Sequence, residues 1–470
     1  MRKLSLLLAL TLLVACLFGS AHAELEPLNT TDEITLRVLL IEQTELFRAM
    51  ADKFTEMHPN IKIELIETSS ATTTMRNLAA DNNLPDLYFF TNFDLLVSNP
   101  FMKDITEYVE NDPEYELLYP SLQKIGYIDG ERCFFVIGKY DPYLFFLDKA
   151  VFDKMNVEMP SQDWTWDEML ELVETMTDPS QQIWGLAYDG IGLRTLGGVG
   201  LQDNAIGEYG WDGENYAFDT AWVECADIES EFIRLGYRPL QGSEEWLAVE
   251  PDDTNAGASG RVAMAIKSFW NLNSTYLQPA AQERGIQMVP YLPPRGEDVE
   301  NGGQFSAQHI AAISPTCEYP REAYEVLKFL SWSKEGWLAR CEAYATLTDE
   351  NGEKLYQTAN CLPLIRDEEV KQATIELLPD LGYWNDWEGF FDAITNPVTY
   401  GGRTIPGFNS FITDYYHGAD FAGHTGIITA IEAGDVDPYD YADDLNEKGR
   451  QYYEEAMEVF YSIYGEPTAE

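Results

Sequence analysis

The segment EITLRVLLIEQTELFRAMADKFTEMHPNIKIELIE, residues 33–67, decides the fold. Its first nine residues are mostly apolar, which is typical of a buried strand. Apolar residues then recur at helical spacing from Leu46 to Phe54, and Pro59 ends that helix. The run IKIELIE (61–67) alternates as a second strand does. A strand, a helix and a strand in this order predict two parallel strands joined by a covering helix.

The same alternation continues directly after this segment. A second helix is expected around 74–81, and LPDLYFF (84–90) ends in a third apolar strand. These elements predict an α/β domain with a parallel sheet. Because ligands of such sheets bind beyond the carboxyl ends of the strands, we expect ligand loops at 42–44 and 90–94.

Length and charge limit the class of protein. The chain has 470 residues, of which 45% are apolar, and this is more than one core usually organises, so we expect two lobes. Its 30 basic and 80 acidic residues give a formal net charge of -50. Nucleic acid is therefore excluded as a partner, since phosphate binding needs the opposite charge, and the acidic surface is explained by solubility.

The N-terminus predicts export from the cytoplasm. Arg2 and Lys3 precede an apolar run over 4–18, and small residues at Ala21 and Ala23 suit a signal peptidase. We therefore expect a signal peptide over 1–23 and an extracellular or periplasmic mature chain. In the alternative, LVAC (13–16) is a lipoprotein signal, and Cys16 carries the lipid that anchors the protein to the membrane.

No pattern predicts a metal, a cofactor or a catalytic group. The six cysteines have irregular spacing, although Cys341 and Cys361 could close a loop in an exported protein. The acidic run GDVDPYDYADD (434–444) lacks the spacing of a calcium loop and is interpreted as a structural turn. The glycine-rich RTLGGVG (194–200) is neither a Walker loop nor a dinucleotide fingerprint.

Several segments in order carry a resemblance to a known family. They are FTEMHPNIKIEL (54–65), AADNNLPDLYFF (79–90), PFMKDITEYVEND (100–112), YLFFLDKAVFDKMNVEMPSQDWTWDEMLELVETM (143–176), GRVAMAIKSFW (260–270) and AAISPTCEYPREAYEVLKFLSWSKEGW (311–337). Together they resemble the extracellular solute-binding proteins of carbohydrate ABC transporters, the family that includes maltose-binding protein.

The resemblance implies an α/β fold of the two-lobed, periplasmic-binding-protein-like type II class, with hinged lobes and a ligand cleft between them. It places lobe 1 at 31–140 plus 287–335 and lobe 2 at 141–286 plus 336–470. The chain would cross between the lobes near 140–142 and 286–290, with a further return after Trp337. The segments 248–259 and 342–364 are longer than this fold needs.

The resemblance also implies a function without chemistry. The chain would be a monomeric component of an ABC importer that captures a mono- or oligosaccharide by lobe closure and delivers it to a membrane permease. Three alternatives stay open at this point: a ligand such as a polyamine or peptide, a sensor for a membrane receptor, and a secreted glycoside hydrolase. The last would need two carboxylates across a scissile bond.

A sugar site needs flat rings for the sugar faces and polar groups for the hydroxyls. The resemblance and the strand ends together predict a set of ligand residues. Phe90 and Phe93 could instead be core residues, Asp94 could cap the helix that begins near Phe93, and Asp141 could be a turn residue. We expect Trp164 and Trp166 to pack within their lobe, and Phe269 to support Trp270. The predicted polar residues are Gln43, Asn92, Asp94 and Asp141, and the predicted stacking rings are Phe90, Phe93, Tyr140, Trp270, Tyr383 and Trp384.

Overall fold

The computed structural model describes most of the chain. The described residues are 25–41, 43–68, 70–188, 191–201, 208–240, 243–249, 258–297, 299, 306–394 and 404–467. The predicted signal peptide, with both of its candidate cleavage sites, lies outside them.

One mixed sheet runs through the described part of the chain, in the strand order β2-β1-β3-β8-β4-β6-β5, with β7 also paired to β4. β1 is parallel to both β2 and β3, which confirms the parallel arrangement predicted from residues 33–90. A separate small hairpin joins β9 and β10. The strands are β1 (Ile34–Leu40), β2 (Ile61–Glu67), β3 (Leu87–Phe90), β4 (Val136–Asp148), β5 (Trp184–Tyr188), β6 (Val262–Ser268), β7 (Met288–Tyr291), β8 (Ser306–Ile313), β9 (Asp420–Phe421) and β10 (His424–Thr425).

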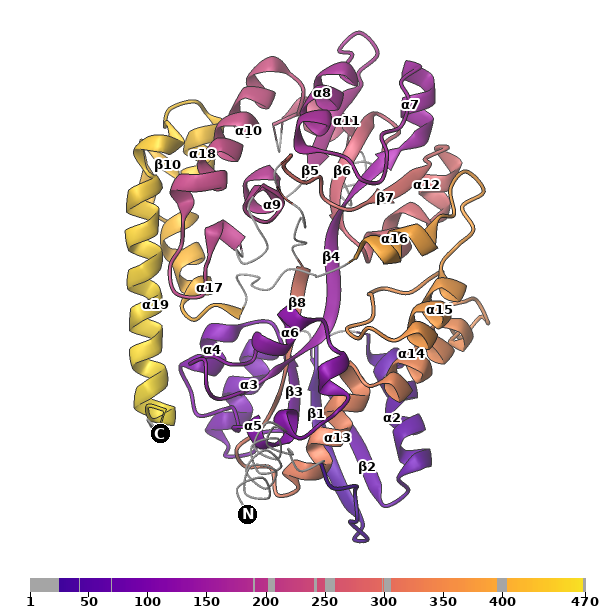
Figure 1. Cartoon of the computed structure of the whole chain (residues 1–470), viewed down its shortest axis with the longest axis vertical. Helices are drawn as coiled ribbons and strands as arrows, with labels where there is room; N and C mark the ends of the chain where they lie inside the picture. The colour runs from indigo at the N-terminus through magenta and orange to yellow at the C-terminus, as the bar shows by residue number, and fades with distance from the viewer. Residues whose placement is uncertain are drawn as a thin grey trace, which may run out of the picture.

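Helices cover this sheet on both halves (Figure 1). Their bounds are α2 (Thr44–Met57), α3 (Ala71–Ala80), α4 (Phe93–Val97), α5 (Thr106–Glu110), α6 (Pro120–Lys124), α7 (Lys149–Met155), α8 (Trp166–Thr175), α9 (Leu193–Gly200), α10 (Val223–Leu235), α11 (Glu244–Val249), α12 (Pro279–Glu283), α13 (Pro320–Ser331), α14 (Lys334–Thr346), α15 (Glu368–Leu377), α16 (Trp387–Ala393), α17 (Phe408–Phe411), α18 (Ile427–Glu432) and α19 (Ala442–Tyr464), with the short turn η7 (Pro438–Asp440) before α19.

Strand β4 belongs to both halves of the molecule. Its first part, Val136–Pro142, pairs with β8, and its second part, from Tyr143 to Asp148, pairs with β6 and β7. In Figure 1 it runs through the centre and links the lower lobe to the upper lobe. Because β7 pairs with the second part of β4, residues 288–291 lie with the upper lobe. The expected crossing at 286–290 is therefore wrong, and the chain returns only after Tyr291.

Each half has its own hydrophobic core. The first core lies between β1, β3, β8 and the helices α2 and α13. The second core lies beneath α7 and α8, and there Trp164 and Trp166 are buried, as the sequence predicts. The sequence assigned 336–470 wholly to lobe 2, but α14 and α15 add Trp337, Tyr344 and Val370 to the first core. They do so because α14 packs against α2 and α13.

The C-terminal helix α19 contacts both lobes and has 23 residues, which makes it about 35 Å long at 1.5 Å per residue. Near its start, Ala442 and Leu445 belong to a third core, formed with the segment around Trp222. Near its end, Met457 and Phe460 are buried in the first core. Figure 1 shows the helix along one side of the molecule, beside the lower and the upper lobe.

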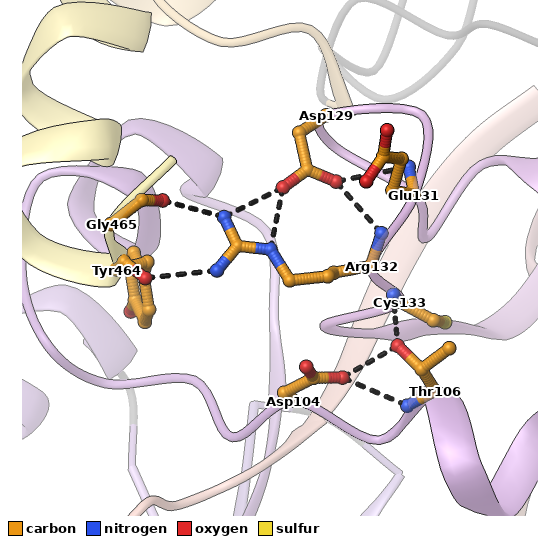
Figure 2. A network of polar contacts seen from close by, with 8 residues as sticks. All are labelled: Asp104, Thr106, Asp129, Glu131, Arg132, Cys133, Tyr464 and Gly465. Atoms are coloured by element: carbon orange, nitrogen blue, oxygen red, sulfur yellow. Dashed lines mark hydrogen bonds and ion pairs between the residues drawn. The ribbon is translucent and has the colours of Figure 1, made fainter. Parts of the chain in front are cut away.

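Arg132 holds the C-terminal end of α19 to the first lobe (Figure 2). Its guanidinium donates to the carbonyl oxygens of Tyr464 at 2.9 Å and Gly465 at 2.7 Å. Its Nε donates to Asp129 Oδ2 at 2.7 Å, which fixes the orientation of the guanidinium. The last carbonyls of a helix lack partners within the helix, so this cation satisfies two acceptors at the negative end of the helix dipole.

We expect Arg132→Met to lower the free energy of unfolding by about 1.5 kcal/mol, because two charge-assisted hydrogen bonds to the helix end are lost. Urea denaturation measures this loss. Arg450→Met is the matched control, because Arg450 lies on α19 and pairs only with the exposed Glu454 in the described part of the chain. Exposed pairs of this kind contribute little. Equal losses in the two variants would contradict the role of Arg132.

Candidate ligand site

Asp141 and Trp270 meet where β4 passes from one lobe to the other. The backbone N–H of Trp270 donates to Asp141 Oδ1 at 3.0 Å, and the N–H of Phe269 donates to the Pro142 carbonyl at 2.8 Å. The bond from Phe269 continues the antiparallel pairing of β4 with β6, and the bond from Trp270 is made to the Asp141 side chain. Asp141 is only 3% exposed, so its carboxylate holds the backbone of Trp270 instead of facing solvent.

The two rings at the end of β6 separate as the sequence predicts. Phe269 is fully buried in the first core, whereas Trp270 is 44% exposed. The carbonyl of Trp270 accepts hydrogen bonds from Asn273 and Ser274, both at 3.1 Å, so its backbone is held on both sides. The result is an accessible indole ring on a rigid backbone beside the crossover, with Phe269 as its support.

Lys139 lies two residues before Asp141 in β4, so the two side chains are on the same side of the strand. Its Nζ is 3.9 Å from Asp141 Oδ2, and its backbone is paired with His309 of β8. Lys139 also lines a small cavity at the carboxyl end of β1. The residues around that cavity are Leu40, Ile41, Gln43, Phe47, Phe89, Gly138, Lys139, His309 and Arg340.

Gln43 lies at the N-terminus of α2, in the loop where the sequence predicts a ligand contact. Its φ of 57° and ψ of 38° are left-handed, a conformation that is uncommon outside glycine and is found often at functional sites. Its side chain makes no capping hydrogen bond to the helix. Gln43 is therefore available to a group that enters the cavity.

Asn92 and Asp94 both act as caps, although of different helices. Asn92 Oδ1 accepts from the N–H of Leu95 at 3.2 Å and caps α4. Asp94 was expected as a ligand residue or as the cap of α4, but its Oδ2 accepts from the N–H and the hydroxyl of Ser410, each at 2.8 Å, at the start of α17. Burial raises the pKa of Asp94, and the bonds from Ser410 partly oppose this rise. Asp94 thus joins the first lobe to the C-terminal segment.

Three of the predicted stacking rings lie in the core. Phe90 and Phe93 are fully buried, and the Phe93 ring lies 5.1 Å from that of Phe135. Tyr140 is also buried, and its carbonyl accepts from the N–H of Leu362. The three rings are covered by neighbouring side chains, so none of them has a face open to a ligand. Phe90 and Phe93 are therefore core residues, which was the alternative considered for them.

The late aromatic pair lies at the junction of the two cores. The Tyr383 hydroxyl donates to the Met288 carbonyl on β7 at 3.2 Å, and burial raises its pKa. Trp384 contacts both cores, and its ring lies 4.6 Å from that of Trp387. Both side chains are half-buried. Among the described residues, neither of them forms a hydrogen bond with Asp141.

Sequence reasoning missed Lys139, His309 and Arg340. One signal was available, since Lys139 is the basic residue of the strand VIGKYDPYLFFLD, which is mostly apolar. No signal marked Arg340, because it lies on α14, whose packing against α2 could not be read from the sequence.

The cysteines do not form the loop considered above. Cys133, Cys225, Cys317, Cys341 and Cys361 are all buried and free. Burial raises the pKa of the Cys341 thiol to about 12, so it is unreactive at neutral pH. Among the described residues no cluster of three or more His, Cys, Asp or Glu could hold a metal. A search of the same residues for a helix long and apolar enough to cross a membrane finds none.

The two lobes share strand β4, and Asp141 and Trp270 lie where the strand crosses between them. This arrangement is typical of a two-lobed binding protein. Residues 41–334, more than half of the chain, match the family described as bacterial extracellular solute-binding protein. The chain belongs to this family.

Solved structures have the same fold. The sugar-binding protein MalE from Xanthomonas citri is 13% identical, with a TM-score of 0.64 over 91% of this chain and 99% of that one. An ABC substrate-binding protein from Listeria monocytogenes, solved with cycloalternan, is 16% identical, with a TM-score of 0.62 over 89% and 99%.

The cyclic α-maltosyl-1,6-maltose binding protein of Arthrobacter globiformis is 15% identical, with a TM-score of 0.63 over 90% and 99%. These likenesses confirm the two-lobed fold predicted from the sequence. No curated protein sequence gives a significant match.

Proposed function

We propose that this chain is the ligand-binding component of an ABC importer, and that it captures a mono- or oligosaccharide between its lobes and delivers it to a membrane permease. One observation carries the proposal: the half-exposed Trp270, whose backbone is held by the buried Asp141 where β4 joins the two lobes. Such a ring offers the apolar face that a sugar requires. The sugars named for proteins of the same fold support this ligand class.

The proposed mechanism is a shift between open and closed states. A ligand that contacts both lobes only when they are closed stabilises the closed state by that contact energy. Lobe 1 would be built around the first core and lobe 2 around the second core, and β4 would carry the hinge. Trp270 would bind the sugar face, while Gln43 and Asn92 would bind its hydroxyls. No catalytic step is needed for this work.

The proposal includes export to the cell surface or periplasm. The mature chain would begin near Glu24 as a monomer, or at a lipidated Cys16. The mass of the protein purified from its own host distinguishes these two forms. A sensor for a membrane receptor would use the same capture step, and a pull-down with the solubilised permease distinguishes transport from sensing.

A thermal-shift screen of the mature protein tests the ligand class. We expect at least one mono- or oligosaccharide to raise the melting temperature, because a ligand that binds only the folded state adds about 2.7 kcal/mol of stability at 100 times its Kd. Polyamines and peptides belong in the same screen, since the net charge of -50 would attract a cation. No response to any carbohydrate, together with a response to a polyamine, would overturn the sugar assignment.

Incubation of the pure protein with the sugar that binds tests whether it is an enzyme. We expect the sugar to be recovered intact. Release of shorter products would show that the chain is a glycosidase.

A further inference from the structure

We propose that the cavity at the N-terminus of α2 is an anion subsite, and that the ligand of this protein carries a carboxylate there, as a uronic acid does. The inference rests on the proposed function, because it assigns a substrate class to the same site. Lys139 connects the two regions, since it lines the cavity and also lies 3.9 Å from the Asp141 carboxylate that holds Trp270.

The charge of the cavity differs from that of the whole protein. Lys139, His309 and Arg340 line it, and none of the described residues around it is acidic. The chain as a whole has 80 acidic and only 30 basic residues. Basic side chains from β4, β8 and α14 therefore converge on one small space in a strongly acidic protein.

Within the described part of the chain, Arg340, which lines this cavity, has an unused hydrogen-bond donor. Its side chain is only 2% exposed, and its Nε has no hydrogen-bond partner in the part of the chain that the structure describes. Its Nη2 donates to the Leu330 carbonyl at 2.6 Å, and its guanidinium lies over the Phe47 ring at 5.4 Å, so the group is held in place. A buried donor without an acceptor is costly, and a carboxylate oxygen is the acceptor that a guanidinium binds best.

The end of α2 adds a second attraction for an anion. This helix has 14 residues, and the side chain of Gln43 at its N-cap makes no capping bond. The first N–H groups of a helix lack partners within it, and the helix dipole is positive at this end. Lys139, Arg340 and the helix N-terminus thus favour the same sign of charge.

The size of the cavity limits its occupant. The cavity has a volume of about 310 Å³ including its mouth, and most of it is too narrow for a water molecule. This is room for one small polar group and not for a sugar ring. A carboxylate would enter the cavity while the ring that carries it stays outside, on the side of Asp141 and Trp270.

Thermal-shift titrations at constant ionic strength test the subsite. The probes are sodium glucuronate and galacturonate, the neutral sugars glucose and galactose, and sodium acetate with sodium chloride as the salt control. We expect a uronate to raise the melting temperature saturably, with an apparent Kd at least tenfold lower than that of its neutral sugar. Lys139→Met is expected to remove this preference for the uronate over the neutral sugar.

Two further variants make the result interpretable. Arg340→Gln keeps a donor but removes the charge, and it should lower the affinity for the uronate at least tenfold. Lys62→Met removes an exposed lysine of β2, which in the described part of the chain pairs only with the exposed Glu33. This variant should leave the affinity for the uronate unchanged. Circular dichroism and the melting temperature without ligand show that each variant is folded.

Each outcome decides the proposal. A response to acetate that is lost in Lys139→Met supports the subsite even if no sugar binds, and that result would refute the proposed function alone. Equal binding of uronates and neutral sugars, binding that persists in Lys139→Met, or no response to any anion would overturn the subsite. A response to neutral sugars alone would overturn it and leave the proposed function in place.

Discussion

Replacing Trp270 with alanine is expected to weaken binding of the carbohydrate ligand about 30-fold, or about 2 kcal/mol, and to leave the protein folded. The loss is that of one stacking surface, since aromatic anchors commonly contribute this much to binding. The fold is expected to survive, because the ring is 44% exposed and the backbone bonds to Asp141, Asn273 and Ser274 do not involve the side chain. Isothermal titration calorimetry of the two proteins measures the difference.

Tyr439→Ala is the matched control for this experiment. Tyr439 is also an exposed aromatic residue, with 57% of its surface accessible, and it lies on η7 before α19, outside the predicted site. We expect its removal to leave the affinity unchanged. Unchanged affinity in a folded Trp270→Ala protein would contradict the stacking role, and an equal loss in both variants would show a general effect on the fold.

The order of elements was predictable from the sequence because it depends on local patterns. Alternating and helical spacings of apolar residues predicted β1, α2, β2 and β3, and the structure has all four with shifts of only one or two residues. The structure also has a capping box of Thr165 and Glu168 at the start of α8. The separation of Phe269 from Trp270 followed from the family position.

The surroundings of the site were not predictable in the same way. The backbone of Tyr140 pairs with Leu362, and the partner of Asp94 is Ser410, which lies more than 300 positions further along the chain. Such contacts are set by how distant segments pack, and a single sequence contains no periodic signal for them. For the same reason the cavity beside Gln43 could not be predicted, since it requires Arg340 of α14 to lie against Phe47 of α2.

Asp148 makes the stability of the fold depend on pH in an unusual direction. This residue ends β4 and is fully buried, and its Oδ1 accepts from the N–H groups of Ala150 and Gln287. Its Oδ2 has no partner among the described residues. Burial raises the pKa of this carboxyl from 3.8 to about 6, against the opposing effect of the backbone hydrogen bonds.

The sign of the effect follows from which state binds the proton more tightly. Between about pH 4 and pH 6 the folded state keeps the proton of Asp148 while the unfolded state releases it, so the contribution of this group to stability falls as the pH rises through that window. The rise of the pKa from 3.8 to about 6 corresponds to about 3 kcal/mol of stability, which the fold loses fully above pH 6.

Asp148→Asn is therefore expected to stabilise the protein, because the amide keeps the Oδ1 acceptor and never ionises. We expect a gain of about 3 kcal/mol in the free energy of unfolding at pH 8 and about half of that at pH 5, where the native carboxyl is still mostly protonated. Urea denaturation at the two pH values measures both gains, and their difference isolates Asp148 from the other carboxyls. Asp153→Asn, on the exposed face of α7 beside Lys149, should change the stability by less than about 0.5 kcal/mol. A gain that does not depend on pH would show that Asp148 is not protonated in the folded protein, and that β4 ends on a buried charge.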